Sequence, residues 1–262
     1  MRNAPATPIW SPSDSMVRGS WMTGWMASIQ RDRGIRLETY DDAWHWSVQD
    51  LPGFWSSIAD FFSVRWDAPP GEVVSADPMH QVSWFRDSQL NFARELISRL
   101  GSGTVIHSRS QTRAGFDLTA AELADHVARA RMGLVSLGIS RGDRVAAYLP
   151  NIPETLILML AAASIGAPFT SCPPEFGARA VADRLRQVEP ALLVATNGYS
   201  HKGRAIDRRG VVGELMTSPA IALPNVVRIV ADGLATRTGE RGPRAHGQTQ
   251  AAGSGKKKAL SR

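Results

Sequence analysis

The stretch from residue 141 to 190 alternates strand and helix patterns, and this alternation leaves few folds open to the chain. Residues 144–149 (RVAAYL) form a short apolar run, which is typical of a buried strand in a parallel sheet. A helix is expected over 153–165, because Pro153 suits a first helical position and Gly166 suits the left-handed residue that often ends a helix. A strand over 167–171, an amphipathic helix over 177–188 and a strand over 191–196 follow.

The same pattern continues on both sides of this stretch. Thr119 and Glu122 have the spacing of a capping box, in which each side chain satisfies a free backbone N–H at the start of a helix. Further strands are expected over 104–108, 116–118 and 226–230, and a further helix over 205–217. Strands that alternate with helices of this length predict an α/β fold, with a helical leader, a partial, mainly parallel sheet and helices on both faces of that sheet.

The amino-terminal region is rich in tryptophan, because all eight tryptophans lie between residues 10 and 84. Trp21 and Trp25 are four residues apart, and Trp55, Ile58 and Phe62 also follow helical spacing, so each group is expected to line one helix face. An aromatic platform for a ligand is the alternative. We favour packing, because large aromatic side chains bury the most area per residue and can seal a helical leader onto a core.

Residues 231–262 carry most of the positive charge. The whole chain has a formal net charge of +6, and this segment holds seven Lys or Arg against Asp232 and Glu240, which leaves the other 230 residues at only +1. A nearly neutral body predicts no specific nucleic-acid binding. Leu234 and Leu260 are the only large apolar residues of the segment, so a basic, disordered tail is expected.

The sequence contains no strong motif for a disulfide, a metal site or a phosphate-binding loop. Cys172 is the only cysteine and the six histidines are scattered, so no disulfide and no metal site is assigned. The glycine spacing of 198–203 is that of a phosphate-binding P-loop, but Arg204 and Ala205 replace the required Lys and Ser/Thr. A signal peptide and an 18-residue apolar run are both absent, which together with the single cysteine predicts a cytoplasmic protein away from membranes.

Several segments, in order along the chain, resemble the front part of the adenylate-forming acyl-CoA synthetases, and acetoacetyl-CoA synthetases most of all. In the α/β region these segments are DLTAAEL (117–123), GDRVAAYLPNIPE (142–154), residues 161–190 and NGYSHKGRAIDRR (197–209). In the leader they are residues 8–14, 39–64 and 84–97, which are similar to the region shared with acetyl-CoA synthetases. The resemblance covers about residues 8 to 230. It divides the chain into a tryptophan-rich leader (1–100), a first α/β subdomain of an AMP-binding domain (101–230) and the basic tail (231–262).

The resemblance implies an acetoacetate–CoA ligase, which uses ATP and Mg²⁺ to form acyl-AMP and then passes the acyl group to CoA. Acetoacetate, ATP and CoA are thus the small-molecule partners that it implies. The family's Ser/Thr/Gly-rich phosphate loop and its catalytic lysine do not occur in these 262 residues. We therefore assign no catalytic residue and expect an amino-terminal fragment that is inactive alone. One half of a split ligase and a non-catalytic module that binds CoA or a protein are the alternatives.

The resemblance also implies a coenzyme contact at one edge of the sheet. The turn at 169–175 and the loop at 201–204 match regions that lie against the CoA nucleotide in the family, which points to Phe169, Ser171, Lys202 and Arg204. Lys and Arg suit the phosphates, and open α/β sheets bind ligands at the carboxyl ends of their strands. Ser171 and Cys172 replace two glycines of the acetyl-CoA branch. Near residue 230 an open apolar sheet edge is expected, through which the chain can associate with itself.

Overall fold

The computed structural model describes residues 9–110, 112–218 and 226–229. The chain divides into two compact units, residues 1–90 and residues 91–262, and each is considered by itself below. The basic tail that the sequence predicts over 231–262 lies outside the described residues.

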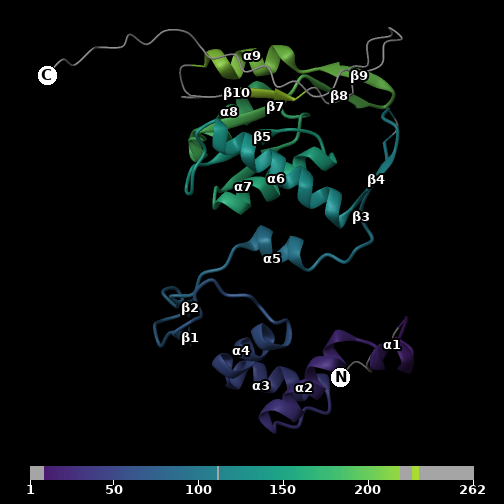
Figure 1. The fold of residues 1–262 in the computed structure, drawn as a ribbon, viewed down its shortest axis with the longest axis vertical. Coiled ribbons are helices and arrows are strands. Elements are labelled where there is room, and N and C mark those ends of the chain that lie inside the picture. Colours follow the sequence, from purple (N-terminus) through teal and green to yellow (C-terminus); the bar gives the residue numbers. More distant parts are fainter. Residues whose placement is uncertain (1–8, 111, 219–225, 230–262) are drawn as a thin grey trace, which may run out of the picture. The chain divides into compact units, whose positions relative to one another are not determined.

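The first unit is the helical leader (Figure 1). Its helices are α1 (Asp14–Arg18), α2 (Trp21–Arg33), α3 (Tyr40–Gln49) and α4 (Leu51–Phe61), followed by the antiparallel strands β1 (Glu72–Val74) and β2 (Trp84–Arg86). Each helix begins at a side chain that accepts a backbone N–H from its first turn, namely Ser13, Ser20, Thr39 and Asp50. These short polar residues therefore set where the leader's helices start.

The leader's core is built around Trp25, which is only 4% exposed. Its ring stacks on Trp46 at 6.0 Å between centroids and meets the edge of Phe54 at 5.6 Å. Trp21 lies one turn earlier on α2, yet it is 77% exposed, with Phe61 and Phe62 at its ring. The expectation that both tryptophans share a buried face is thus wrong for Trp21, because the small core formed by α2, α3 and α4 includes Trp25 and Ile29 of α2 but not the helix's first turn.

The second unit holds an α/β arrangement. Its helices are α5 (Phe92–Ser98), α6 (Ala120–Ser136), α7 (Pro153–Ile165), α8 (Ala178–Val188) and α9 (Arg209–Thr217). The strands β5 (Val145–Tyr148), β6 (Phe169–Cys172), β7 (Leu192–Thr196) and β10 (Val226–Ile229) form one parallel sheet in the order β10-β7-β5-β6. Two antiparallel pairs accompany it: β3 (Thr104–Ser108) with β4 (Phe116–Thr119), and β8 (Gly198–His201) with β9 (Arg204–Asp207).

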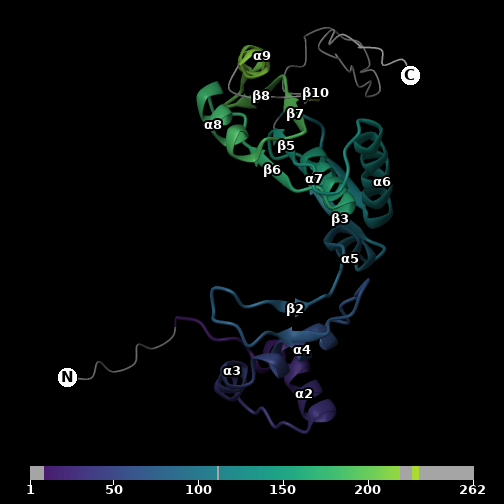
Figure 2. The same ribbon diagram turned by 90° about the vertical axis from the view of Figure 1, so that its left-hand side faces the viewer.

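The parallel sheet is covered on both faces, as the sequence predicts. Val145 and Ala147 of β5 pack in one apolar cluster with residues of α5, α6 and α7. Ala146 and Tyr148 point the other way, into a second cluster with residues of α8 and α9. Figure 2 shows α6 and α7 on one side of the strands and α8 and α9 on the other. β6 and β10 are the edge strands, and self-association through such an edge stays a prediction.

The local signals of the sequence place several boundaries well. α7 spans the expected residues, and Gly166 follows it in the left-handed conformation, with φ of 82°. The capping box forms at the start of α6, where the Thr119 N–H donates to Glu122 Oε2 at 2.8 Å and the Glu122 N–H donates to Thr119 Oγ1 at 3.3 Å. These elements depend on contacts within one turn of chain, so residue types alone indicate them.

The helix expected over 205–217 is wrong at its start. The structure begins α9 only at Arg209, and residues 198–207 form the hairpin of β8 and β9. Lys202 and Gly203 both have positive φ (49° and 74°), as the two-residue turn of a tight hairpin requires. The hairpin also rules out a P-loop at 198–203, because such a loop leads directly into a helix.

Two glycine-to-alanine changes should affect stability in opposite directions. Gly166→Ala should lower the free energy of unfolding by about 1 kcal/mol, because a side chain is strained at this positive φ and its Cβ would lie 3.1 Å from Arg141 Cγ. Gly133→Ala, inside α6 with open space around the new methyl group, should raise it by about 0.8 kcal/mol. Urea unfolding of both variants measures this difference. Stabilisation by Gly166→Ala would contradict the assigned helix end.

Candidate functional site

The candidate site lies where the parallel strands end. β5, β6 and β7 run in the same direction and finish at Tyr148, Cys172 and Thr196, so their carboxyl ends share one edge of the sheet. Loops at this edge are the usual ligand-binding position in open α/β sheets. From here β6 leads into the loop 173–177, and β7 leads into the β8–β9 hairpin.

The tip of the β8–β9 hairpin is positively charged. Lys202 and Arg204 are exposed, and neither makes an ion pair with another residue in the described part of the chain. Their neighbour His201 is exposed as well, and it lies opposite Arg204 in the antiparallel register of β8 and β9. The tip therefore offers two free cationic side chains to an anionic ligand.

The acid at the base of this hairpin is already paired. Arg209 Nη2 lies 2.5 Å from Asp207 Oδ2, and the Arg209 backbone N–H donates to Asp207 Oδ1 at 2.8 Å. The side-chain hydrogen bond from Arg209 is the main reason that the pKa of Asp207 falls to about 2. Asp207 thus stays ionised and is offset by Arg209, so it does not cancel the charge at the tip.

The loop after β6 is held by side chains from other elements. The Tyr148 hydroxyl lies 2.7 Å from the carbonyl oxygens of both Pro174 and Phe176. Arg208, between β9 and α9, places Nη2 3.4 Å from the Glu175 carbonyl oxygen. The same Nη2 donates to the Tyr199 hydroxyl of β8 at 3.2 Å. Through Arg208 the base of the hairpin is therefore connected to the loop after β6.

The residues predicted as coenzyme contacts occupy different positions. Lys202 and Arg204 lie together at the hairpin tip, and Ser171 is exposed on β6 next to the strand's carboxyl end. Phe169 begins β6, three residues from that end and so roughly 10 Å away, and packs against the cluster under α5, α6 and α7. The structure thus places Ser171 next to the carboxyl edge, Lys202 and Arg204 at the tip of the hairpin that leaves this edge after β7, and Phe169 toward the opposite edge.

Other reactive side chains of this unit have structural surroundings. Cys172 is buried and free, and burial raises the pKa of its thiol, which disfavours the reactive thiolate. Glu154, in the first turn of α7, is paired with Arg113 at 2.6 Å between Oε1 and Nη1. The Arg113 guanidinium also lies over the Phe116 ring, 4.9 Å from its centroid. This pair holds the β3–β4 connection to the start of α7.

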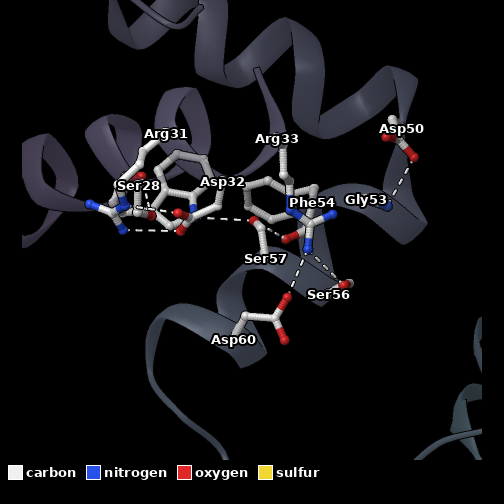
Figure 3. A network of polar contacts seen from close by, with 11 residues as sticks. Ser28, Arg31, Asp32, Arg33, Asp50, Gly53, Phe54, Ser56, Ser57 and Asp60 are labelled. Carbon is white, nitrogen blue, oxygen red and sulfur yellow. Dashed lines mark hydrogen bonds and ion pairs between the residues drawn. The ribbon is translucent and has the colours of Figure 1, made fainter. Parts of the chain in front are cut away.

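The leader contains a polar network between α2 and α4 (Figure 3). Trp25 Nε1 donates to Ser57 Oγ at 3.1 Å, and the Ser57 hydroxyl donates to the Phe54 carbonyl oxygen at 2.6 Å. Arg33 Nη2 donates to Ser56 Oγ at 2.9 Å and to Asp60 Oδ2 at 2.8 Å. Each donor bonds to an acceptor on the opposite helix or on the same helix. We therefore interpret the network as one that holds α2 against α4.

In the part of the chain that the structure describes, no group of three or more His, Cys, Asp or Glu side chains is placed to hold a metal ion. No helix in that part is both long and apolar enough to cross a membrane.

Two family descriptions match the chain. "AMP-binding enzyme" matches residues 102–251, and "Acetyl-coenzyme A synthetase N-terminus" matches residues 40–95. The first match extends beyond residue 230, where the resemblance read from the sequence ends. The two matches contain most of the α/β unit and most of the second half of the leader.

The individual proteins that this chain is similar to include several CoA synthetases. The acetoacetyl-coenzyme A synthetase of Rhizobium meliloti (strain 1021) is 34% identical over 220 residues, which are 83% of this chain and 34% of that protein. A malonamoyl-CoA synthetase of Penicillium aethiopicum is 32% identical over 226 residues, 83% of this chain and 31% of the relative. The solved structure of the acetoacetyl-CoA synthetase from Streptomyces lividans matches with a TM-score of 0.80 and 33% identity, over 89% of this chain and 36% of that one. The chain therefore spans about a third of the length of these relatives.

The structural interpretation of the leader network predicts different effects at two adjacent serines. Ser57→Ala should lower the free energy of unfolding by about 1–3 kcal/mol, because Ser57 is 2% exposed and its loss leaves the Trp25 N–H buried without an acceptor. Ser56→Ala should change it by less than about 0.5 kcal/mol, because Ser56 bonds Arg33 at the surface. Urea unfolding compares the two variants, and equal effects would contradict the interpretation.

Proposed function

Because the chain belongs to the AMP-binding enzyme family, we propose that it is the amino-terminal part of an acetoacetate–CoA ligase. Such a ligase activates acetoacetate with ATP as acyl-AMP and then forms the thioester with CoA. The relative from Rhizobium meliloti and the solved structure from Streptomyces lividans support acetoacetate as the acid, since both are named acetoacetyl-CoA synthetases. The malonamoyl-CoA synthetase is similar over the same share of this chain, so synthetases named for different acids share this level of similarity to it.

The observation that carries the proposal is the cationic hairpin tip at the carboxyl edge of the sheet. Lys202 and Arg204 are exposed and free of ion pairs among the described residues, and the acid nearest in sequence, Asp207, is already paired with Arg209. CoA carries a pyrophosphate and a 3′-phosphate, and Arg and Lys are the side chains that best bind such groups. These residues therefore fit the nucleotide end of CoA, with Ser171 at the same edge of the sheet.

We assign no residues of this chain to ATP or Mg²⁺. The described residues place no set of three acidic, histidine or cysteine side chains for a metal ion, and the 262 residues contain no Ser/Thr/Gly-rich phosphate loop ending in Pro-Lys. The role that we propose for these residues is to bind and orient CoA, while ATP chemistry falls to other parts of the ligase. A second polypeptide that carries those parts is the alternative way to complete the enzyme.

The proposal predicts CoA binding that depends on the hairpin. In isothermal titration calorimetry, CoA should bind the 262-residue chain saturably, and Arg204→Ala should weaken binding about tenfold through loss of one charge-assisted hydrogen bond. Arg129→Ala is the matched control, because Arg129 is paired with Asp125 on α6, away from the hairpin. A titration of both proteins with dephospho-CoA, which lacks the 3′-phosphate, shows whether Arg204 binds that group.

Two results would contradict this proposal. Undetectable CoA binding by the folded chain would remove the coenzyme role, and equal weakening by Arg204→Ala and Arg129→Ala would remove the hairpin from it. The same preparation, supplied with acetoacetate, ATP, Mg²⁺ and CoA, is expected to release no pyrophosphate. Measurable turnover would show instead that this polypeptide completes the reaction alone.

A further inference from the structure

Four consecutive carbonyl oxygens in the loop after β6 lie within hydrogen-bond distance of a donor, and two of them share the single proton of the Tyr148 hydroxyl. The Pro173 oxygen accepts the Phe176 N–H at 3.2 Å, which closes a tight turn. The oxygens of Pro174 and Phe176 both lie 2.7 Å from the Tyr148 hydroxyl, and the Glu175 oxygen lies 3.4 Å from Arg208 Nη2. Loops usually leave part of their backbone to water. This loop is held by the protein at every carbonyl from 173 to 176.

Tyr148 attaches the loop to the centre of the sheet. It is the last residue of β5, the strand between β6 and β7, and it is 0% exposed. Burial raises the pKa of its hydroxyl, so the group remains protonated and able to donate. Phenylalanine would fill nearly the same volume, whereas a buried hydroxyl is costly unless it is hydrogen-bonded. Its contacts with the two carbonyl oxygens thus explain why a tyrosine, and not a phenylalanine, occupies this buried position.

Arg208 attaches the same loop to the hairpin. Its backbone N–H donates to the Asn197 carbonyl oxygen at 2.8 Å, directly after β7. Its guanidinium lies over the Tyr199 ring of β8, 5.4 Å from the centroid, while Nη2 contacts both the Tyr199 hydroxyl and the Glu175 carbonyl oxygen. Nε of the same side chain is buried without a hydrogen-bond partner among the described residues. This arrangement leaves one polar group unsatisfied while Nη2 bridges the two loops.

We propose that Tyr148 and Arg208 are positioning residues, which fix the loop 173–176 relative to the β8–β9 hairpin and so set the shape of the coenzyme-binding edge. This inference rests on the proposed function, because it assigns the fixed loop and the cationic tip to one ligand. Neither residue needs to contact the ligand. They act through the backbone of the loop 173–176. The position of this loop relative to Lys202 and Arg204 decides whether the loop and the hairpin tip can contact the same coenzyme molecule.

Backbone hydrogen exchange tests the proposal without any ligand. Tyr148→Phe and Arg208→Met remove the donors and keep most of the side-chain volume, and both should speed exchange at the Phe176 amide, whose N–H donates to the Pro173 oxygen within this loop, about tenfold. The amides of α7, which lies on the other face of the sheet, should keep their rates. Tyr40→Phe, which removes an exposed hydroxyl in the leader, is the control and should leave the loop unchanged. Unchanged loop exchange in both donor variants would overturn the proposal.

CoA titration of the same variants adds the functional readout. Both donor variants should bind CoA about tenfold more weakly, and Arg208→Lys, which keeps a donor, should recover part of the affinity. Faster loop exchange with unchanged CoA affinity would overturn the positioning role. If the unaltered chain does not bind CoA while exchange responds as expected, the proposed function fails and the loop attachment stands. If Tyr148→Phe does not fold, Arg208→Met decides alone, because Arg208 is only half-buried.

Discussion

The second unit depends on the parallel pairing of β5 with strands on both of its sides. Val145 pairs with Phe169 of β6 and with Leu192 of β7, and the residues of β5 are almost completely buried. A peptide group in such a place cannot bond to water, so each unpaired N–H or C=O would cost about 1–3 kcal/mol. The two neighbouring strands remove this cost, and the alternating side chains of β5 supply the floor of both apolar clusters.

The candidate site follows from the same pairing. Because β5, β6 and β7 are parallel and in register, they end together at one edge of the sheet, and the chain leaves that edge in three loops, with the loop after β5 between those after β6 and β7. Tyr148, at the end of β5, then lies under the loop after β6, while the hairpin after β7 carries Lys202 and Arg204. The fold thus brings one fixed loop and one cationic turn to the same edge, although more than 25 residues separate them in sequence.

Residue types predict those parts of this fold that depend on local contacts. Pro153, Gly166 and the Thr119–Glu122 capping box mark their helices because the relevant hydrogen bonds lie within one turn. The β8–β9 hairpin is missed, since its polar strands lack the apolar alternation that marks a buried strand. The exposure of Trp21 is missed as well, because helical spacing shows which residues share a face but not how far the opposing core extends.

For the candidate site as well, some residues were proposed from the sequence and others were not. Lys202 and Arg204 were proposed from the sequence, because their loop matches the family's coenzyme-facing loop and their charge suits phosphates, and their role stays a prediction. Tyr148 and Arg208 were not, because their partners lie 26 to 33 residues away and are backbone oxygens, which any residue type supplies. The only signal was a hydroxyl within an otherwise apolar strand, which indicates a hydrogen-bond partner without identifying it. Phe169 was chosen as the first residue of the segment 169–175 that matches the family's coenzyme-facing turn, yet it packs against the core at the start of β6.

Binding of CoA at the carboxyl edge of the sheet would change the amide chemical shifts of that edge during a CoA titration. We expect saturable shifts at Ser171, at residues 175–177 and at residues 199–204, with the leader helices and α6 unaffected. Shifts confined to the leader, or a spectrum that does not change at saturating CoA, would contradict this expectation.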